Sequence, residues 1–510
     1  AALAVVEPTG SGLGGGGFWL LHRAEDGLQV MVDGRERAPL SARPDMYLDL
    51  NGEVVPGLSQ DGALAAGIPG EPAALAHIAE RYGRLPLARS LAPAIRYARE
   101  GFPVDEKLQR AIAGRRAALA ASPAAAAVFL PDGVPPRVGS LLVQGELART
   151  LSRLAEEGAD GFYRGATADA LVDGVRGAGG IWSKKDLRSY RVVERTPLVL
   201  DYRNLRIVTA PLPSSGGMVL GIALNVLAGY DWARLTSADR QHVTVEALRR
   251  AFRDRAEHMG DPDFVPAPLQ LLSPGYASGL RAGIRLDKAT PSRSLTAAML
   301  RDGEEGGNTT HFSVLDAEGN RVAATLSINL PLGSGFMPPG TGVLLNNEMD
   351  DFAIRPQTPN AYGLVGGVAN AVAPGKRMLS SMSPTFVETP ARVAILGTPG
   401  GSRIISMVLG AVLAFADGAG AGALVTQPRL HHQYLPDEVV YEDGALSDTD
   451  QEALIQRGHR LRRSEPYGNM QAIVWERTRG RIEAASDPRG IGQAQTQVGQ
   501  AAPPGAAVGR

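Results

Sequence analysis

Residues 309–329 contain the first candidates for chemistry, because hydroxyl side chains recur there at strand spacing. Apolar residues occupy even positions and polar residues occupy odd positions on both sides of a short "DAEGN" segment, which is typical of two half-buried β-strands. The polar set is Thr309, His311, Ser313, Thr325, Ser327 and Asn329. A hydroxyl group becomes a nucleophile when a base lies beside it. We therefore regard this polar face as a candidate reacting surface.

The loop between the two strands decides which hydroxyl groups meet. A three-residue loop over 317–319 puts glycine where a left-handed backbone is needed and sets Thr309 opposite Ser327. A two-residue turn would set Thr309 opposite Ile328. Because opposed residues share one face of a sheet, only the three-residue loop pairs polar with polar. We predict that register, although threonine–serine pairs also occur in ordinary sheets.

Composition excludes several classes of function. Lysine and arginine number 52 and aspartate and glutamate number 53, so no basic footprint for nucleic acid or anionic membranes is present. The absence of cysteine excludes thiol catalysis, cysteine metal sites and disulfides, and leaves the redox compartment undecided. No run of about 18 apolar residues predicts a membrane span. The start at Ala1, without methionine or a signal core, indicates a trimmed chain.

The flanking segments must position the polar face. The pattern predicts a strand, a turn and a strand after Gly15, which argues against a dinucleotide site at "GSGLGG", since that fingerprint needs a following helix. Helices alternating with loops are predicted over 62–285. The polar segment 286–308 reads as a mobile surface segment, strands resume at Thr309, and the tail from Gln493 reads as disordered.

Eight stretches, in order along almost the whole chain, resemble the γ-glutamyltranspeptidase family of bacterial type. They are "EPTGSGLGGGGF", "DGRERAP", "PLPSSGG", "GDPDF", "NTTHFSVLDAEGN", "LLNNEMDDF", "PGKRMLSSMSPT" and "TPGGSRI". The resemblance implies an α+β fold, the four-layer αββα sandwich of the N-terminal-nucleophile hydrolase superfamily. It also implies a proenzyme that cuts its own Asn308–Thr309 bond.

Cleavage would give a large subunit, 1–308, and a small subunit, 309–510, that pair as a heterodimer within one αββα unit. Thr309 would then carry both a hydroxyl and a free α-amine. An N-terminal amine has a pKa of about 7.7–8.0, so it can act as the base for its own hydroxyl. No cofactor or metal is implied: His311 reads as structural, and His431–His432 lacks a metal-ligand pattern. Thr310, on the apolar side of the strand, is expected to serve packing.

The resemblance also assigns roles to residues other than Thr309. Arg35 would grip the α-carboxylate of a γ-glutamyl donor, for which a planar guanidinium is suited. Ser380 and Ser381 would bind the same carboxylate, and Asn329, Glu348 and Asp351 would bind the α-ammonium. Gly400 and Gly401 would donate their backbone N–H groups to the oxyanion. Ser327 would assist the nucleophile, and Tyr362 would belong to a lid over the pocket.

The expected activity is that of a γ-glutamyltransferase and glutathione hydrolase. The enzyme would pass the γ-glutamyl group of glutathione or similar donors through an ester on Thr309 to amino acids, peptides or water. Resemblance to exported relatives suggests a periplasmic or secreted location. One alternative is a glutaryl (cephalosporin) acylase of the same fold, whose substrate lacks an α-ammonium and would leave Glu348 and Asp351 without a partner. The other is an uncleaved, non-catalytic binding protein.

Overall fold

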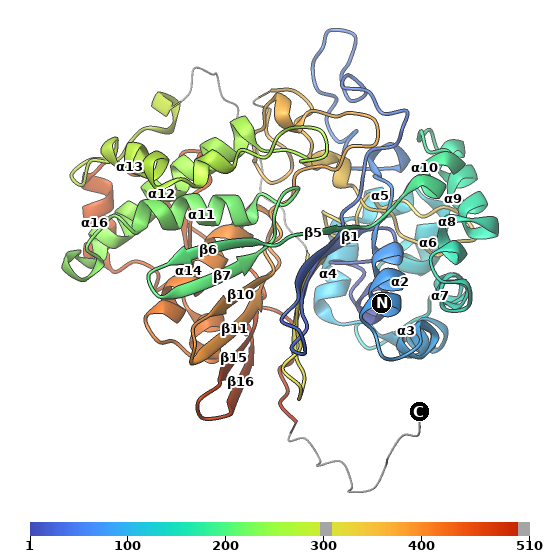
Figure 1. Ribbon diagram of the computed structural model, residues 1–510. Coiled ribbons are helices and arrows are strands. Elements are labelled where there is room, and N and C mark those ends of the chain that lie inside the picture. The colour runs from blue at the N-terminus through green and yellow to red at the C-terminus, as the bar shows by residue number, and fades with distance from the viewer. Residues whose placement is uncertain (296–308, 357, 498–510) are drawn as a thin grey trace, which may run out of the picture.

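Two antiparallel sheets face each other, and helices cover the outer side of each (Figure 1). The computed structural model describes residues 1–295, 309–356 and 358–497. The five-stranded sheet has the order β5 (Val193–Arg195), β2 (Gln29–Gly34), β1 (Gly16–His22), β9 (Arg321–Ser327) and β8 (Thr310–Leu315). The six-stranded sheet has the order β16 (Arg481–Ser486), β15 (Gln471–Glu476), β11 (Arg392–Gly397), β10 (Thr385–Glu388), β7 (Leu205–Thr209) and β6 (Leu198–Tyr202).

The layers follow from which elements touch. Strands β8 and β9 contact β11, so the two sheets form the central layers. On the side of the six-stranded sheet lie α11 (Gly216–Leu227), α12 (Ser237–His258), α13 (Pro274–Ala282), α14 (Ile404–Ala416), α15 (Ala421–Thr426) and α16 (Asp448–Gln456). The chain therefore has the predicted α+β sandwich.

On the other side, beyond the five-stranded sheet, lies a group of helices from the first 190 residues (Figure 1). They are α1 (Ala2–Val6), α2 (Glu71–Arg81), α3 (Leu87–Glu100), α4 (Glu106–Gly114), α5 (Arg116–Ala120), α6 (Pro123–Phe129), α7 (Gly145–Glu157), α8 (Asp160–Tyr163), α9 (Gly165–Gly177) and α10 (Lys184–Ser189). Short pairings complete the fold: β3 (Phe102–Pro103) with β4 (Leu141–Leu142), and β12 (Leu430–His431) with β13 (Val439–Tyr441) and β14 (Leu461–Arg463).

The hairpin of β8 and β9 has the predicted register. Thr310 pairs with Leu326 and Leu315 pairs with Arg321, which continues to Thr309 opposite Ser327. The backbone N–H of Asp316 donates to the carbonyl of Asn320 across the three-residue loop (3.1 Å), and Gly319 has φ +91°. Because L-residues rarely adopt that backbone, glycine here fixes the loop length and hence the register.

Two predictions about the flanking segments need correction. Residues 193–209, within the stretch assigned to helices and loops, form β5, β6 and β7, because their short alternation was outweighed by the alanine-rich helical pattern around them. The segment 286–308 was expected to be loose, yet Ala289 and Ser292 are buried and the N–H of Ser292 donates to Asp437 (2.7 Å). Residues 296–308 lie outside the described residues.

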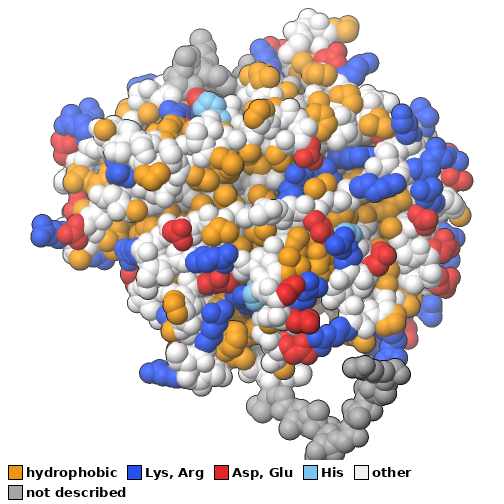
Figure 2. Space-filling view, in the orientation of Figure 1, with side chains coloured by type: hydrophobic (Ala, Val, Ile, Leu, Met, Phe, Trp, Pro, Cys, Tyr) orange, Lys and Arg blue, Asp and Glu red, His pale blue; other side chains and the backbone are white. Residues whose placement is uncertain are grey.

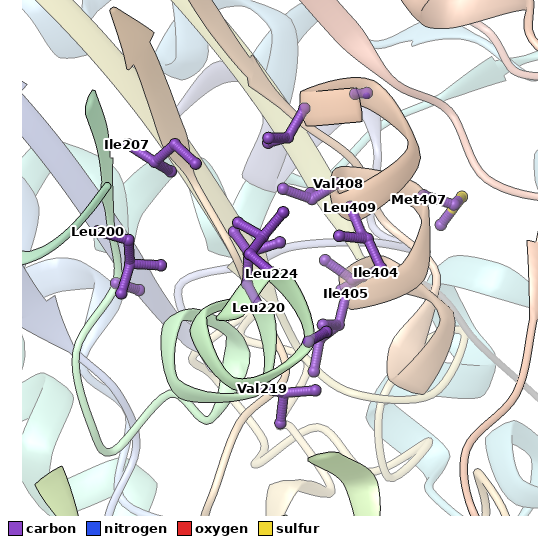
Figure 3. Close-up of a cluster of buried hydrophobic side chains, with 14 of the residues drawn as sticks. Leu200, Ile207, Val219, Leu220, Leu224, Ile404, Ile405, Met407, Val408 and Leu409 are labelled. Carbon is purple, nitrogen blue, oxygen red and sulfur yellow. The ribbon is translucent and has the colours of Figure 1, made fainter. Parts of the chain in front are cut away.

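The main hydrophobic core joins the helices on the six-stranded sheet to that sheet and extends to the five-stranded sheet. Figure 3 shows side chains of α11, among them Leu220 and Leu224, gathered with Ile405 and Val408 of α14. Burying one such side chain contributes about 1.5–3 kcal/mol. Helix α14 is therefore held firmly at its start, where the turn that enters the candidate site lies.

The surface agrees with the near-neutral composition. Basic and acidic side chains are interspersed over the face seen in Figure 2. Among the described residues, no helix has both the length and the apolar character needed to cross a membrane.

Candidate active site

One small pocket between the sheets gathers most of the predicted site residues. Its volume is about 20 Å³, enough for about one water molecule. The lining includes Arg35, Thr309, Ser327, Asn329, Glu348, Asp351, Tyr362, Ser380, Ser381 and Gly401. Gly400 precedes Gly401 in the sequence but does not line the pocket. Asn308 lies outside the described residues. Segments far apart in the sequence therefore meet at Thr309.

Thr309 stands just before β8 and is buried, with 4% of its surface exposed. Its Oγ1 lies 3.5 Å from the Oγ of Ser327, at the long limit of a hydrogen bond. The Ser327 hydroxyl accepts the backbone N–H of Asn329 (2.7 Å), so its orientation is fixed by the end of its own strand. The two hydroxyls thus meet as the register requires.

A buried cation faces two carboxylates across the pocket. Arg35 follows β2 directly, and its Nη1 and Nη2 lie 2.8 Å from Glu348 Oε2 and 2.5 Å from Asp351 Oδ2. Burial raises the pKa of Glu348 to about 7, against the opposing effect of Arg35. Such a cluster presents adjacent positive and negative groups to any ligand, which suits a molecule that carries both charges.

Glu36 is a buried member of this cluster that was not singled out from the sequence. Its Oε2 lies 3.4 Å from Arg35 Nη1, and its side chain has no exposed surface. Burial and the charge of Glu348 raise the pKa of Glu36 well above its usual range. The motif "DGRERAP" already contained it. However, only the fold shows that it lies beneath the arginine.

Ser380 is held in place by a second set of residues that was also missed. The carbonyl of Ser380 accepts the hydroxyl (2.7 Å) and the N–H (2.8 Å) of Ser215, and the Ser215 hydroxyl also accepts Nε of Arg255 (2.9 Å). Burial is the main cause that lowers the pKa of Arg255 to about 10, which still leaves it charged. The motif "PLPSSGG" was the sequence signal for this support.

The glycine turn before α14 lines the pocket with Gly401 and Ser402. Gly400 and Gly401 have φ values of +141° and +55°, and a short 3₁₀ turn, Gly401–Arg403, leads into α14. Backbone N–H groups at a helix start are unpaired donors with a favourable dipole. This turn can therefore stabilise a negative oxygen that develops in the pocket.

Tyr362 lines the pocket and packs against this turn. Its Oη donates to the carbonyl of Asn329 (2.9 Å), and a Cβ placed on Gly401 would lie 2.4 Å from its ring. The ring thus bridges the end of β9 and the glycine turn. The pocket volume is about 20 Å³, so a ligand larger than a water molecule requires the lining to rearrange.

Gly401→Ala tests this packing. We expect kcat/KM of the active protein to fall at least about tenfold, because the new methyl group displaces the ring and shifts the turn. Gly480→Ala is the matched control: its φ is +62°, but no atom lies within 4 Å of the added Cβ, so it adds backbone strain without crowding. Steady-state kinetics and thermal unfolding of both variants check the prediction. Equal kinetic loss in both would contradict it.

His311, on β8, has hydrogen-bond partners at both ring nitrogens. His311 Nδ1 lies 2.8 Å from Thr325 Oγ1, its Nε2 lies 3.2 Å from Ser313 Oγ, and burial lowers the pKa of His311 to about 3. It is therefore neutral and held within the hairpin, as its structural interpretation requires.

Within the described part of the chain, one group has the composition of a metal site: His242, Glu246 and His459. Hydrogen bonds account for it. His242 Nδ1 lies 2.8 Å from His459 Nε2, and His242 Nε2 lies 2.8 Å from the carbonyl of Arg285. Arg249 and Arg250 both pair with Glu246, and these charges oppose a dication. The group is better described as an anchor for the segment around 285.

Comparison with known proteins decides the family. A sequence profile described as Gamma-glutamyltranspeptidase matches residues 1–497. The chain belongs to the γ-glutamyltranspeptidase family. The glutathione hydrolase proenzyme of Pseudomonas sp. (strain A14) is 41% identical over 491 residues, covering 93% of this chain and 83% of that protein. The corresponding proenzyme of Escherichia coli (strain K12) is 40% identical over 496 residues, covering 96% and 85%.

Other members of the superfamily are also similar. The Acylase ACY 1 proenzyme of Pseudomonas sp. (strain V22) is 37% identical, covering 93% of this chain and 84% of that protein. A cephalosporin acylase structure from Bacillus halodurans matches with a TM-score of 0.84 and 28% identity, covering 98% and 90%. A γ-glutamyltranspeptidase structure from Helicobacter pylori matches with a TM-score of 0.55 and 38% identity, covering 57% and 84%. The γ-glutamyltranspeptidase family thus shares this sandwich with related acylases.

Proposed function

We propose that the protein is a γ-glutamyltransferase and glutathione hydrolase that matures by cutting its own Asn308–Thr309 bond. Thr309 Oγ1 attacks the carbonyl carbon of Asn308, the peptide nitrogen leaves as the new α-amine, and water opens the resulting ester. The products are fragments 1–308 and 309–510, which stay together as one folded unit. The relatives' proenzyme names support this maturation.

In turnover the α-amine of Thr309 takes the proton of its own hydroxyl as Oγ1 attacks the γ-carbonyl carbon of the donor. The oxygen of the tetrahedral intermediate accepts N–H groups from Gly400 and Gly401. Collapse transfers the proton to the leaving amine and leaves a γ-glutamyl ester on Thr309. An amino acid, a peptide amine or water then attacks this ester and restores the hydroxyl.

The observation that carries the proposal is the mixed charge opposite Thr309. A γ-glutamyl group bears an α-carboxylate and an α-ammonium at the end remote from the scissile amide. Arg35, with Ser380 and Ser381, would receive the carboxylate, while Asn329, Glu348 and Asp351 would receive the ammonium. A zwitterion that binds here gives each buried charge a new partner of opposite sign. These contacts offset the free-energy cost of removing water from the charged groups.

A glutaryl acylase is the second candidate, favoured by the acylase relatives and by the TM-score of the acylase structure. A glutaryl group has no ammonium, so it would leave the charges of Glu348 and Asp351 without a counterpart in a buried pocket. The charge arrangement and the higher identity of the glutathione hydrolases therefore favour the γ-glutamyl donor.

Denaturing gels and two anilide substrates test the proposal. The purified chain should give bands of 308 and 202 residues, and sequencing of the smaller should begin at Thr309. It should release 4-nitroaniline from the γ-glutamyl anilide much faster than from the glutaryl anilide. An uncleaved, inactive chain would support the binding-protein alternative, and preference for the glutaryl anilide would support the acylase. Fractionation of cells tests the proposed periplasmic or secreted location.

The pKa of Glu348 predicts a pH dependence of donor binding. Because burial raises this pKa to about 7, the neutral carboxyl predominates below pH 7 and the charged carboxylate predominates above it. An ammonium binds better to the charged form, so KM for the γ-glutamyl anilide should fall about tenfold as pH rises through 7. KM of Glu348→Gln should stay flat over the same range. A flat wild-type KM would contradict this assignment.

A further inference from the structure

The nucleophile is positioned by its neighbour rather than by its own contacts. Strand β8 begins at Thr310, so Thr309 lies beyond the ladder, and its hydroxyl contact with Ser327 is long at 3.5 Å. If the Asn308–Thr309 bond is cut, as proposed above, Thr309 is also a free chain end. The contacts that hold Thr310 in place then also set the orientation of Thr309.

Thr310 was expected to serve only packing, but its hydroxyl is engaged. Its Oγ1 donates to Oε2 of Glu7 at 2.7 Å, and Thr310 is 5% exposed. The other carboxylate oxygen of Glu7 accepts Nζ of Lys107, on α4, at 3.0 Å. A hydrogen bond to a charged acceptor is about twice as strong as one between neutral groups. The side chain of the first residue of β8 is therefore tied to a separate layer of the fold.

The backbone that follows Glu7 meets the nucleophile as well. The carbonyl of Glu7 accepts the N–H groups of Gly10 (3.0 Å) and Ser11 (3.2 Å), which folds this segment into a turn. A Cβ on Gly10 would lie 3.1 Å from the carbonyl oxygen of Thr309, so the turn packs directly against the Thr309–Thr310 peptide. The segment 7–10 thus contacts the side chain of Thr310 and packs against the Thr309–Thr310 peptide.

We propose that Glu7 is a positioning residue for the Thr309 nucleophile, acting through the hydroxyl of Thr310 and supported by Lys107. The inference rests on the proposed function, because it assigns Thr309 as the attacking group. Glu7 contacts neither the donor pocket nor its charged cluster. Loss of its contact should therefore lower the rate of the chemical steps and leave donor affinity unchanged.

The test uses the full chain with Glu7→Ala, Glu7→Gln, Thr310→Val and Thr310→Ser. The readouts are the time course of self-cleavage, kcat and KM with the γ-glutamyl anilide, and thermal unfolding.

We expect Glu7→Ala and Thr310→Val to lower kcat about 10- to 100-fold, the effect of a misplacement of about 1 Å, with KM unchanged within about twofold. Self-cleavage should slow in parallel. Thr310→Ser keeps the donor and Glu7→Gln keeps an acceptor, so both should restore kcat to within about threefold of wild type.

Glu318→Gln is the matched control, because Glu318 pairs with Arg84 at the far end of the same hairpin. It should leave kcat and self-cleavage unchanged. Wild-type kcat in Glu7→Ala, or equal loss in Thr310→Ser and Thr310→Val, would overturn the inference. A raised KM with normal kcat would do the same. An inactive wild-type chain would instead refute the proposed function, which keeps the two failures distinct.

Discussion

Thr309→Ala should leave a single chain of 510 residues and abolish turnover. The variant lacks the only hydroxyl that the proposal places at the cleavage junction, so neither the Asn308 carbonyl nor a γ-glutamyl amide can be attacked. We expect kcat to fall by at least about 10⁴-fold, as in other enzymes that lose their nucleophile. Denaturing gels and release of 4-nitroaniline measure the two effects.

Thr309→Ser and Thr310→Ser are the controls for this result. Thr309→Ser keeps a hydroxyl at the junction and should still cut itself, whereas Thr310→Ser tests the neighbouring position with the same change. Cleavage of Thr309→Ala, or a new N-terminus at residue 310 in the wild type, would contradict the assignment of Thr309 as the nucleophile.

Asp351→Asn should collapse the discrimination between γ-glutamyl and glutaryl donors. The carboxylate lies 2.5 Å from Arg35 and lines the pocket, where it would face the α-ammonium. Removing one charge from a buried pair costs about 2–5 kcal/mol, so the ratio of kcat/KM for the two anilides should fall about 30-fold or more. The ratio is the relevant quantity, since a general loss of activity would leave it unchanged.

Asp350→Asn is the matched control, one residue away in the same 3₁₀ turn. Asp350 is also buried, and burial raises its pKa to about 6, but its Oδ1 accepts the hydroxyl of Ser59 (2.6 Å) away from the pocket lining. The donor ratio of Asp350→Asn should remain that of the wild type. An equal fall in both variants would show that the turn, rather than the charge of Asp351, sets the preference.

Local rules were sufficient where one short segment contains its own constraints. The alternation over 309–329 and the glycine at 319 predicted the β8–β9 register, which the structure confirms. Helices α2, α3 and α12 follow their apolar spacing in the same way. In contrast, β6 and β7 were missed, because five-residue strands give a weak pattern beside long helices.

The roles given to the site residues came from resemblance, and the fold adds the contacts among them. Arg35 lies more than 300 residues before Glu348 and Asp351 in the chain, yet the three side chains form one ionic cluster. Glu36 contacts Arg35, and Ser215 and Arg255 hold the carbonyl of Ser380 in place; no spacing rule predicts such contacts. Glu7 is similar: it lies 303 positions from Thr310, to which it binds.

The sequence by itself determined the pairing of Thr309 with Ser327, because register depends on alternation and loop length within about twenty residues. The tertiary structure decided everything that depends on packing between layers: the partner of Thr310, the burial of Glu36 beside Arg35 and the contact of Tyr362 with Asn329. Burial and charge at these positions arise only when distant segments are brought together, so they cannot be deduced from any one segment.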